Sequence, residues 1–386
     1  MPRGRQVPIT PEVLDWAIRT SGFSQNEIAD KLDTPPSTLR AWIAGSEKPG
    51  LTVLRRLASL LKRPLATFLL PAPPRSVSVH VEFRHPPGET RRSLNSVEVN
   101  NLREASRIQR GLASILSQLG EPTIPFPSVS TSDDHERVAT EERQRIRVAV
   151  EDQIRWSTHS QALQAWRNAL EQRGVIVFLL PMGKESSRGF SLWNEYAPLI
   201  SVNTQWNYQA RIFTLFHEYA HLITRTSSSC LGHISARLRL GEDHVERWCE
   251  RFAAAFLAPW GAIETVAKQR FGWQLGREIH DLALARKLAN SFHISLRAMT
   301  LRLIDHGIAS WDLYGQIPEY IDKKGGGGGG EGRTRLQIRQ DECGDQTTRV
   351  LIKGLQHDVL CRTDVLSYLD VTDTDLDSLF SESSGR

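Results

Sequence analysis

Apolar residues recur at intervals of three and four along most of this 386-residue chain, which is the spacing of amphipathic helices. One uninterrupted helix is expected over about 141–173. Three short apolar runs in the middle of the chain, 175–181, 189–193 and 198–202, are bounded by turn residues and predict strands of a small sheet. The pattern therefore predicts a mostly helical α+β protein.

The region 10–70 contains five short amphipathic segments. Ser24 and Glu27 have the spacing of a capping box at the start of the second segment. After a short turn comes 36–45, which begins with proline and stops at Gly45; both residues favour helix ends. The order predicts an N-terminal all-α five-helix domain containing a helix-turn-helix.

Charge supports this interpretation. Residues 1–75 hold 11 Lys and Arg against 6 Asp and Glu, whereas the whole chain carries a formal net charge of +4. The remainder is therefore nearly neutral, and the basic excess lies where DNA phosphates would be met.

The strongest chemical signal is His217-Glu218-Tyr219-Ala220-His221, an H-E-x-x-H sequence within a long apolar helical segment. Histidines four residues apart lie on one helix face, so both imidazoles can reach one metal ion. The glutamate after the first histidine is placed to reach a water on that metal. The motif predicts a zinc site with His217 and His221 as ligands and Glu218 as general base. Two hydrogen-bonded core histidines are the alternative.

A catalytic zinc needs a third protein ligand. The longer pattern with a glycine and a third histidine is absent, because Thr224 and Ser227 occupy those positions. A second helical segment, 243–259, carries Glu246 at the flank of its apolar stripe and Glu250 one turn later. A carboxylate beside apolar surface is costly unless it is paired or bound to metal. Glu246 is the expected third ligand, with Glu250 in reserve.

The sequence RGFSLWNEYAPLISVNTQWNYQARIFTLFHEYAHLI, followed by VERWCERFAAAFLAP, resembles the ImmA/IrrE family of metallopeptidases. The resemblance covers about 155–308. It implies a zincin-like domain with one Zn²⁺ per chain, and places Glu246 on the family's glutamate ligand and Cys249 on its Ala/Cys position. Glu250 replaces the usual asparagine, which adds a negative charge near the expected zinc.

The N-terminal region resembles the lambda-repressor/Cro-like (XRE) helix-turn-helix family, including the Gly45-x-x-Lys48-Pro49 turn. The resemblance implies binding to double-stranded DNA, possible homodimerisation, and DNA contacts by Gln25, Ser37, Thr38, Arg40 and Lys48. The recognition helix begins with Pro35-Pro36, which contributes no hydrogen bond to a base. A module of the same fold that recruits a protein partner is the alternative.

Domain boundaries follow from proline-, serine- and glycine-rich stretches. They predict a helix-turn-helix domain at 1–72, a helical bridge and linker at 73–134, a zincin-like domain at 135–322, a Gly-rich linker at 323–333, and a small C-terminal segment at 334–386. In the last segment we expect one or two strands and two short helices.

No apolar run is long enough to span a membrane, and the N-terminus lacks a signal-peptide core. The four cysteines are widely spaced, which is typical of free thiols in a reducing compartment and predicts a cytoplasmic protein.

These features predict a DNA-binding transcriptional regulator with a zinc-dependent endopeptidase domain. By the resemblance, its substrate is a protein, namely a transcriptional repressor cut in a stress, phage or mobile-element response. The alternative is a repressor or antitoxin-like regulator that cleaves nothing and uses the zincin domain as a sensor or partner-binding module.

Overall fold

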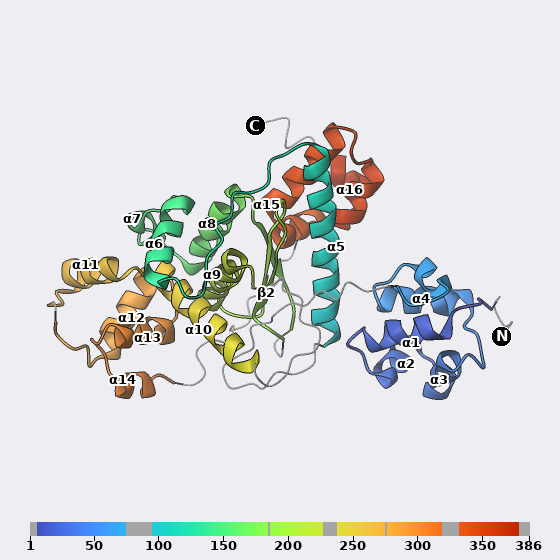
Figure 1. Cartoon of the computed structure of the whole chain (residues 1–386), viewed down its shortest axis with the longest axis horizontal. Helices are drawn as coiled ribbons and strands as arrows, with labels where there is room; N and C mark the ends of the chain where they lie inside the picture. Colours follow the sequence, from blue (N-terminus) through green and yellow to red (C-terminus); the bar gives the residue numbers. More distant parts are fainter. Residues whose placement is uncertain are drawn as a thin grey trace. The chain divides into compact units, whose positions relative to one another are not determined.

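The computed structural model describes residues 6–74, 95–183, 186–226, 238–274, 276–318 and 332–377, with side chains from His244 onward in the fourth range. The chain forms two compact units, one whose described part ends at Ser106 and one that continues from Arg107 (Figure 1). The predicted Gly-rich linker lies outside the described residues except for 332–333, and Cys230 lies outside them entirely.

The first unit is all helical, as predicted. Its elements are α1 (Pro11–Arg19), α2 (Gln25–Leu32), α3 (Pro36–Ile43), α4 (Leu51–Leu60) and the 3₁₀ helix η1 (Leu65–Leu69). The capping box is present: the Ser24 hydroxyl accepts from the Glu27 amide at 3.2 Å, and the Glu27 carboxylate accepts from the Ser24 amide at 2.8 Å. Gly45 takes φ +77° directly after α3, which explains its role as a helix stop.

Helix α5 (Ser96–Gln118) begins in the first unit and continues in the second. Its start contacts the first unit at Gly22, where an added Cβ would lie 2.8 Å from the carbonyl carbon of Asn95. Arg103 donates hydrogen bonds to the carbonyl oxygens of Leu61, at 3.1 Å, and of Thr20. The first unit thus includes residues beyond position 72.

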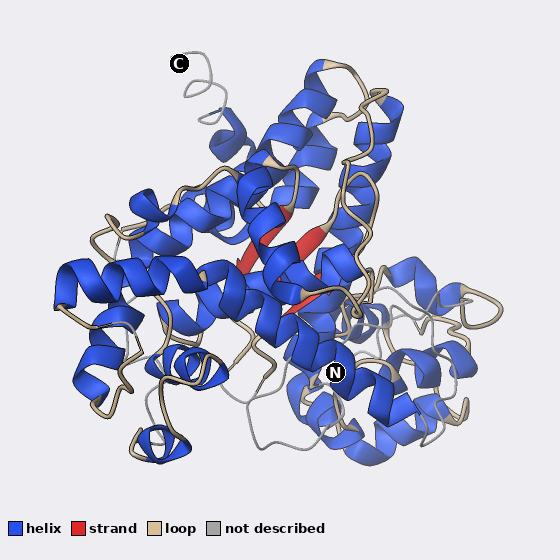
Figure 2. Ribbon diagram, turned by 60° about the vertical axis from the view of Figure 1, so that its left-hand side comes forward, coloured by secondary structure: helices blue, strands red, loops and turns tan. Residues whose placement is uncertain are grey.

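The second unit contains the three predicted strands, β1 (Ile176–Leu180), β2 (Gly189–Leu192) and β3 (Leu199–Asn203). Their order is β1-β3-β2, with β1 parallel and β2 antiparallel to β3. All are almost fully buried, because helices lie around the sheet (Figure 2). The helices near the metal-ligand candidates are α8 (His159–Gln172), α9 (Tyr208–Thr224) and α10 (Leu238–Leu257).

The remaining helices of this unit are α6 (His135–Ile146), α7 (Val150–Gln153), α11 (Trp260–Phe271), α12 (Leu282–Ser291), α13 (Leu296–Asp305), α14 (Trp311–Gly315), α15 (Arg335–Gln356) and α16 (Arg362–Leu369). The single helix expected over 141–173 is wrong: α6, α7 and α8 share that region. Arg147 ends α6 in the left-handed conformation, at φ 60°, although no glycine or proline marks the break.

The C-terminal segment also differs from expectation, since its described part is helical and contains no strand. Helix α15 packs along β1 and against α8. Gly344 interrupts it with non-helical angles, and an added Cβ there would lie 2.0 Å from a carboxylate oxygen of Glu171. That carboxylate accepts the amide hydrogens of Asp345 and Gln346, so it caps the second half of α15.

Among the described residues, no helix is both long enough and apolar enough to cross a membrane.

Candidate metal centre

Helix α9 carries the H-E-x-x-H residues through the core of the second unit. The Asn207 side chain caps its start by accepting from the Ala210 amide at 2.8 Å, and Arg225 ends it in the left-handed conformation, at φ 55°. The helix is buried against α8, α10, β2 and β3, which fixes its rotation. His217, Glu218 and His221 are therefore held rigidly in its C-terminal half.

The two histidines and Glu246 meet at one point. The Nε2 atoms of His217 and His221 lie 3.2 Å apart, and the Glu246 carboxylate oxygens lie 3.1 Å from the first and 3.2 Å from the second. Tetrahedral zinc with ligand bonds of about 2.0–2.1 Å would space its ligand atoms about 3.4 Å apart. The three side chains therefore fit a zinc ion. Their candidate ligand atoms all lie within 4.8 Å of one another.

Electrostatics favour positive charge at this point. Burial by itself would raise the pKa of the Glu246 carboxyl, but hydrogen bonds from His217 and His221 lower that pKa well below its usual range. Burial lowers the pKa of His221, yet contacts with Cys249 and Glu246 raise it well above the ordinary histidine value. The cluster thus attracts protons or, in their place, a divalent cation.

The structure separates the two candidate glutamates of α10. Glu246 reaches the histidine pair, whereas Glu250 is exposed and is not part of the cluster. Cys249, one turn beyond Glu246, is buried and contacts His221, and burial raises the pKa of its thiol. Thr226 was not predicted: its hydroxyl lies 2.9 Å from Nδ1 of His221 and orients that ring.

Strand β2 approaches Glu218 closely because it begins with glycine. A Cβ at Gly189 would lie 2.6 Å from Cγ2 of Thr214, 2.7 Å from the carbonyl oxygen of Ser201 and 3.5 Å from Cγ of Glu218. A side chain there would push the strand away from α9. The sequence placed Gly189 at a strand start but gave no sign of this contact.

The predicted DNA-contacting residues gather around the recognition helix α3. Its buried face carries Leu39 and Trp42, while Arg40 points to solvent. The full predicted set is exposed, apart from half-buried Thr38, and comprises Gln25, Ser37, Thr38, Arg40 and Lys48. Pro36 occupies the first turn of α3, where its missing amide hydrogen removes no helical hydrogen bond.

Two protein-family models match parts of this chain. Residues 17–68 match the helix-turn-helix family model, and residues 170–303 match a peptidase family described as the IrrE N-terminal-like domain. This chain joins an XRE-type helix-turn-helix domain to an IrrE-like peptidase-family domain. A search of curated proteins finds no match to the chain. The IrrE-like match includes His217, Glu218, His221 and Glu246.

Buried side chains from outside α10 hold the end of that helix in the IrrE-like domain. Its last carbonyl groups accept hydrogen bonds from Arg143 to Phe256 at 2.8 Å, from Gln153 to Leu257 at 2.8 Å, and from Arg302 to Ala258 at 3.1 Å. Two of the three donors are cationic, which suits the negative end of a helix dipole. Helix α10, and with it Glu246, is thereby fixed relative to the IrrE-like core.

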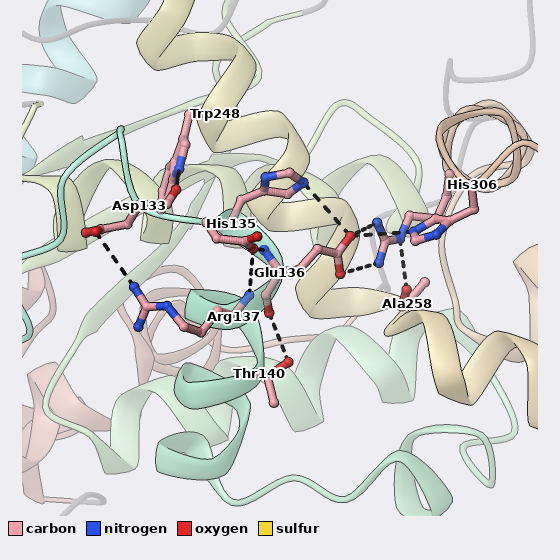
Figure 3. Close-up of polar contacts among 10 residues, drawn as sticks. Asp133, His135, Glu136, Arg137, Thr140, Trp248, Ala258 and His306 are labelled. Carbon is pink, nitrogen blue, oxygen red and sulfur yellow. Dashed lines mark hydrogen bonds and ion pairs between the residues drawn. The ribbon is translucent and has the colours of Figure 1, made fainter.

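Figure 3 shows the polar contacts around Glu136, whose carboxylate also pairs with Arg302. Glu136, in the first turn of α6, accepts from both terminal nitrogens of that guanidinium, one at 2.7 Å. His306 and His135 flank the same carboxylate at 3.6 Å and 3.9 Å. The Trp248 indole of α10 donates to the Asp133 carbonyl at 2.8 Å, which ties α10 to the segment before α6.

Proposed function

We propose that this chain is a DNA-binding regulator whose IrrE-like domain is a zinc-dependent endopeptidase acting on a protein. The meeting of His217, His221 and Glu246 next to a buried Glu218 supports this most directly. Two imidazoles and one carboxylate are a usual ligand set for a catalytic zinc that keeps one position open.

In this proposal His217, His221 and Glu246 hold the metal and Glu218 moves the proton. A bound zinc ion supplies the Lewis acidity that polarises a scissile carbonyl and lowers the pKa of water. Glu218 adjoins the first ligand on the same helix, so its carboxylate can take the proton of the attacking water and return it to the leaving amine. Thr226 orients His221, and the capped α10 positions Glu246.

Strand β2 is the proposed binding edge for the substrate. Among the described strands it pairs on one side only, and it contacts the helix that carries Glu218. At the other edge of the sheet, β1 is covered by α15. An extended peptide added to a sheet edge gains main-chain hydrogen bonds regardless of its side chains, which suits a protein substrate. The proposed substrate is a transcriptional repressor.

The helix-turn-helix domain supplies DNA binding in this proposal. We propose that Arg40 reads a guanine edge in the major groove and that Lys48 contacts phosphate. Both side chains are exposed, and the chain's basic excess lies in the same domain.

The test compares wild type with Glu218→Gln, which keeps the size of the side chain and removes its ability to accept a proton. Each protein is loaded with zinc, its metal content is measured, and it is incubated with proteins encoded beside its gene. Glu250→Gln is the matched control, because Glu250 is an exposed glutamate of α10 outside the cluster.

We expect about one zinc per chain in all three proteins and cleavage of a neighbour by wild type and Glu250→Gln alone. Zinc binding without cleavage in any protein, together with intact DNA regulation by Glu218→Gln, would favour the non-proteolytic sensor. Failure of wild type to bind zinc would contradict the site itself.

A further inference from the structure

A second site lies on the IrrE-like unit, between the C-terminal end of α6 and the C-terminal half of α8. It is a pocket of about 440 Å³, within the usual range of small-molecule sites. Its polar lining consists of Arg145, Arg147, Asn168, Gln172 and Arg173, and no Asp or Glu lines it. The lining therefore favours an anion.

The arginines of this pocket carry more positive charge than the neighbouring acids neutralise. Arg145 pairs with Glu142. For Arg147 and Arg173, no ion pair occurs within the described part of the chain, and the buried Nε of Arg173 has no hydrogen-bond partner there. Of these three guanidinium groups, only that of Arg145 pairs with a carboxylate among the described residues. An anion in the pocket would offset the unpaired positive charge of Arg147 and Arg173.

A second pocket, of about 480 Å³, adjoins the first and shares Arg147 and Val148 with it. Its lining is more apolar, with Ala149, Val150 and Pro259 beside the shared valine. One ligand can therefore place a charged group among the arginines and a less polar group against these residues.

We propose that the paired pockets bind a small phosphate monoester with an apolar body. Guanidinium groups match the geometry of a phosphate, since two N–H groups of one arginine can meet two phosphate oxygens. Arg147 is the central residue, because it lines both pockets and is held in the left-handed conformation at the end of α6.

Glu142 connects this pocket to α9, the helix that carries His217 and His221. This connection determines which arginine can be substituted in a test. The fully buried carboxylate of Glu142 pairs with Arg145 on one side and accepts from the Tyr219 hydroxyl at 2.7 Å on the other, and Tyr219 adjoins Glu218. Substituting Arg145 would therefore disturb α9 as well as the pocket. Arg147 is exposed and outside that network, so Arg147→Gln removes a charge from the site with little effect on folding.

The test measures binding of phenyl phosphate, inorganic phosphate and uncharged phenol to full-length, zinc-loaded protein by calorimetry at fixed ionic strength. Phenyl phosphate should bind one site per chain more tightly than inorganic phosphate, and phenol should not bind detectably. Arg147→Gln should weaken phenyl phosphate binding about tenfold or more, because a charge-assisted hydrogen-bonded contact is lost.

Two controls separate this site from other places where phosphate could bind. Arg155→Gln removes an exposed arginine that lines neither pocket, and Arg40→Gln removes one from the DNA-binding domain. Both should bind phenyl phosphate like wild type. The proposal is overturned if wild type does not bind it, or if Arg147→Gln binds as wild type does, since the anion would then sit on the metal or on the helix-turn-helix.

Discussion

Arg302 donates a hydrogen bond from Nε to the carbonyl oxygen of Ala258 at 3.1 Å, at the end of the helix that carries Glu246. The same guanidinium is held by Glu136 from the first turn of α6. One buried arginine thus joins three helices, α6, α10 and α13, and the position of a proposed metal ligand depends on it.

Replacing Arg302 should lower both the free energy of unfolding and the affinity for zinc. In Arg302→Met the Ala258 carbonyl and the Glu136 carboxylate both lose their partner. Breaking a fully buried pair from one side costs about 3–5 kcal/mol, and the lower end applies here because the Glu136 side chain is 36% exposed. We expect the free energy of unfolding, measured in urea, to fall by about 3 kcal/mol, and zinc affinity to fall with it. Arg286→Met, on the exposed face of α12, is the control and should have little effect. Equal losses in the two variants would argue against the bracing role.

The third metal ligand is tested by comparing two glutamates of one helix. Glu246→Gln removes a charged ligand atom from the cluster, so zinc affinity should fall by about 10-fold or more. Glu250→Gln changes an exposed side chain and should leave affinity within about twofold, as expected of a solvated charge. Competition with a zinc-binding dye measures both. If Glu250→Gln gave the larger loss, the assignment of the ligand would be wrong.

Gly189 offers a test of how closely β2 must approach α9. In Gly189→Ala the new methyl group would meet both Thr214 and the Ser201 carbonyl at under 3 Å, so the strand or helix must shift. Overpacking of this kind costs about 1–3 kcal/mol, and proposed cleavage should fall further because Glu218 moves.

Gly261→Ala is the matched control, since nothing lies within 4 Å of the added methyl in that helix. It should be neutral or stabilise the protein by up to about 1 kcal/mol. Thermal unfolding of the two variants, side by side, decides the question; similar melting temperatures would mean that the contact at Gly189 has no consequence.

The His159–His293 pair should make stability depend on pH. Their Nδ1 atoms lie 2.9 Å apart, and burial, aided by the charge of His159, lowers the pKa of His293 to about 4. Its pKa in the unfolded chain is about 6.5. Between these values the unfolded chain takes up a proton that the folded chain does not, so the free energy of unfolding decreases as pH falls through this window.

The effect of the pair should be on the order of 2 kcal/mol, since one pKa unit is worth about 1.4 kcal/mol and some solvation remains. His293→Gln should flatten the dependence, and urea unfolding at several pH values measures it. Proton uptake by the metal-ligand histidines is common to both proteins and cancels in the comparison. Identical slopes for wild type and variant would show that the pair does not titrate in this way.

DNA-binding measurements can distinguish base recognition by Arg40 from phosphate contact by Lys48 in the helix-turn-helix domain. Arg40→Gln should relax base preference at one position of the site, with a discrimination loss of about 1–3 kcal/mol. Lys48→Gln should weaken binding to all sequences alike and lower the slope of log affinity against log salt by about one. Fluorescence anisotropy with a selected site and its single-base variants measures both. A uniform loss for Arg40→Gln would place that residue on phosphate instead.

Local signals explain what the sequence predicted well. The H-E-x-x-H spacing, the Ser24–Glu27 capping box and the three apolar runs each depend on residues within a few positions of one another. Helical and strand periodicity turns such spacing directly into a shared face. Helical spacing also led to Glu246. It lies at the flank of an apolar stripe, where a carboxylate needs a partner.

The errors have an equally physical origin. Nothing in the composition of 141–173 marks Arg147 as left-handed, because any residue can end a helix when the chain must turn to pack. The strands expected after position 334 are replaced by α15, whose buried face is chosen by β1 and α8 rather than by its own propensity.

By itself, then, the sequence determined the three strands of the sheet, the helix that carries the zinc-motif histidines and the general-base candidate, and the fused helix-turn-helix domain. Only the tertiary structure decided that Glu246 rather than Glu250 meets the histidines, that Gly189 lets β2 reach Glu218, and that Arg143, Gln153 and Arg302 hold the end of α10. These contacts join residues far apart in the chain. They depend on how whole elements pack, and periodicity within one element carries no information about its distant partner.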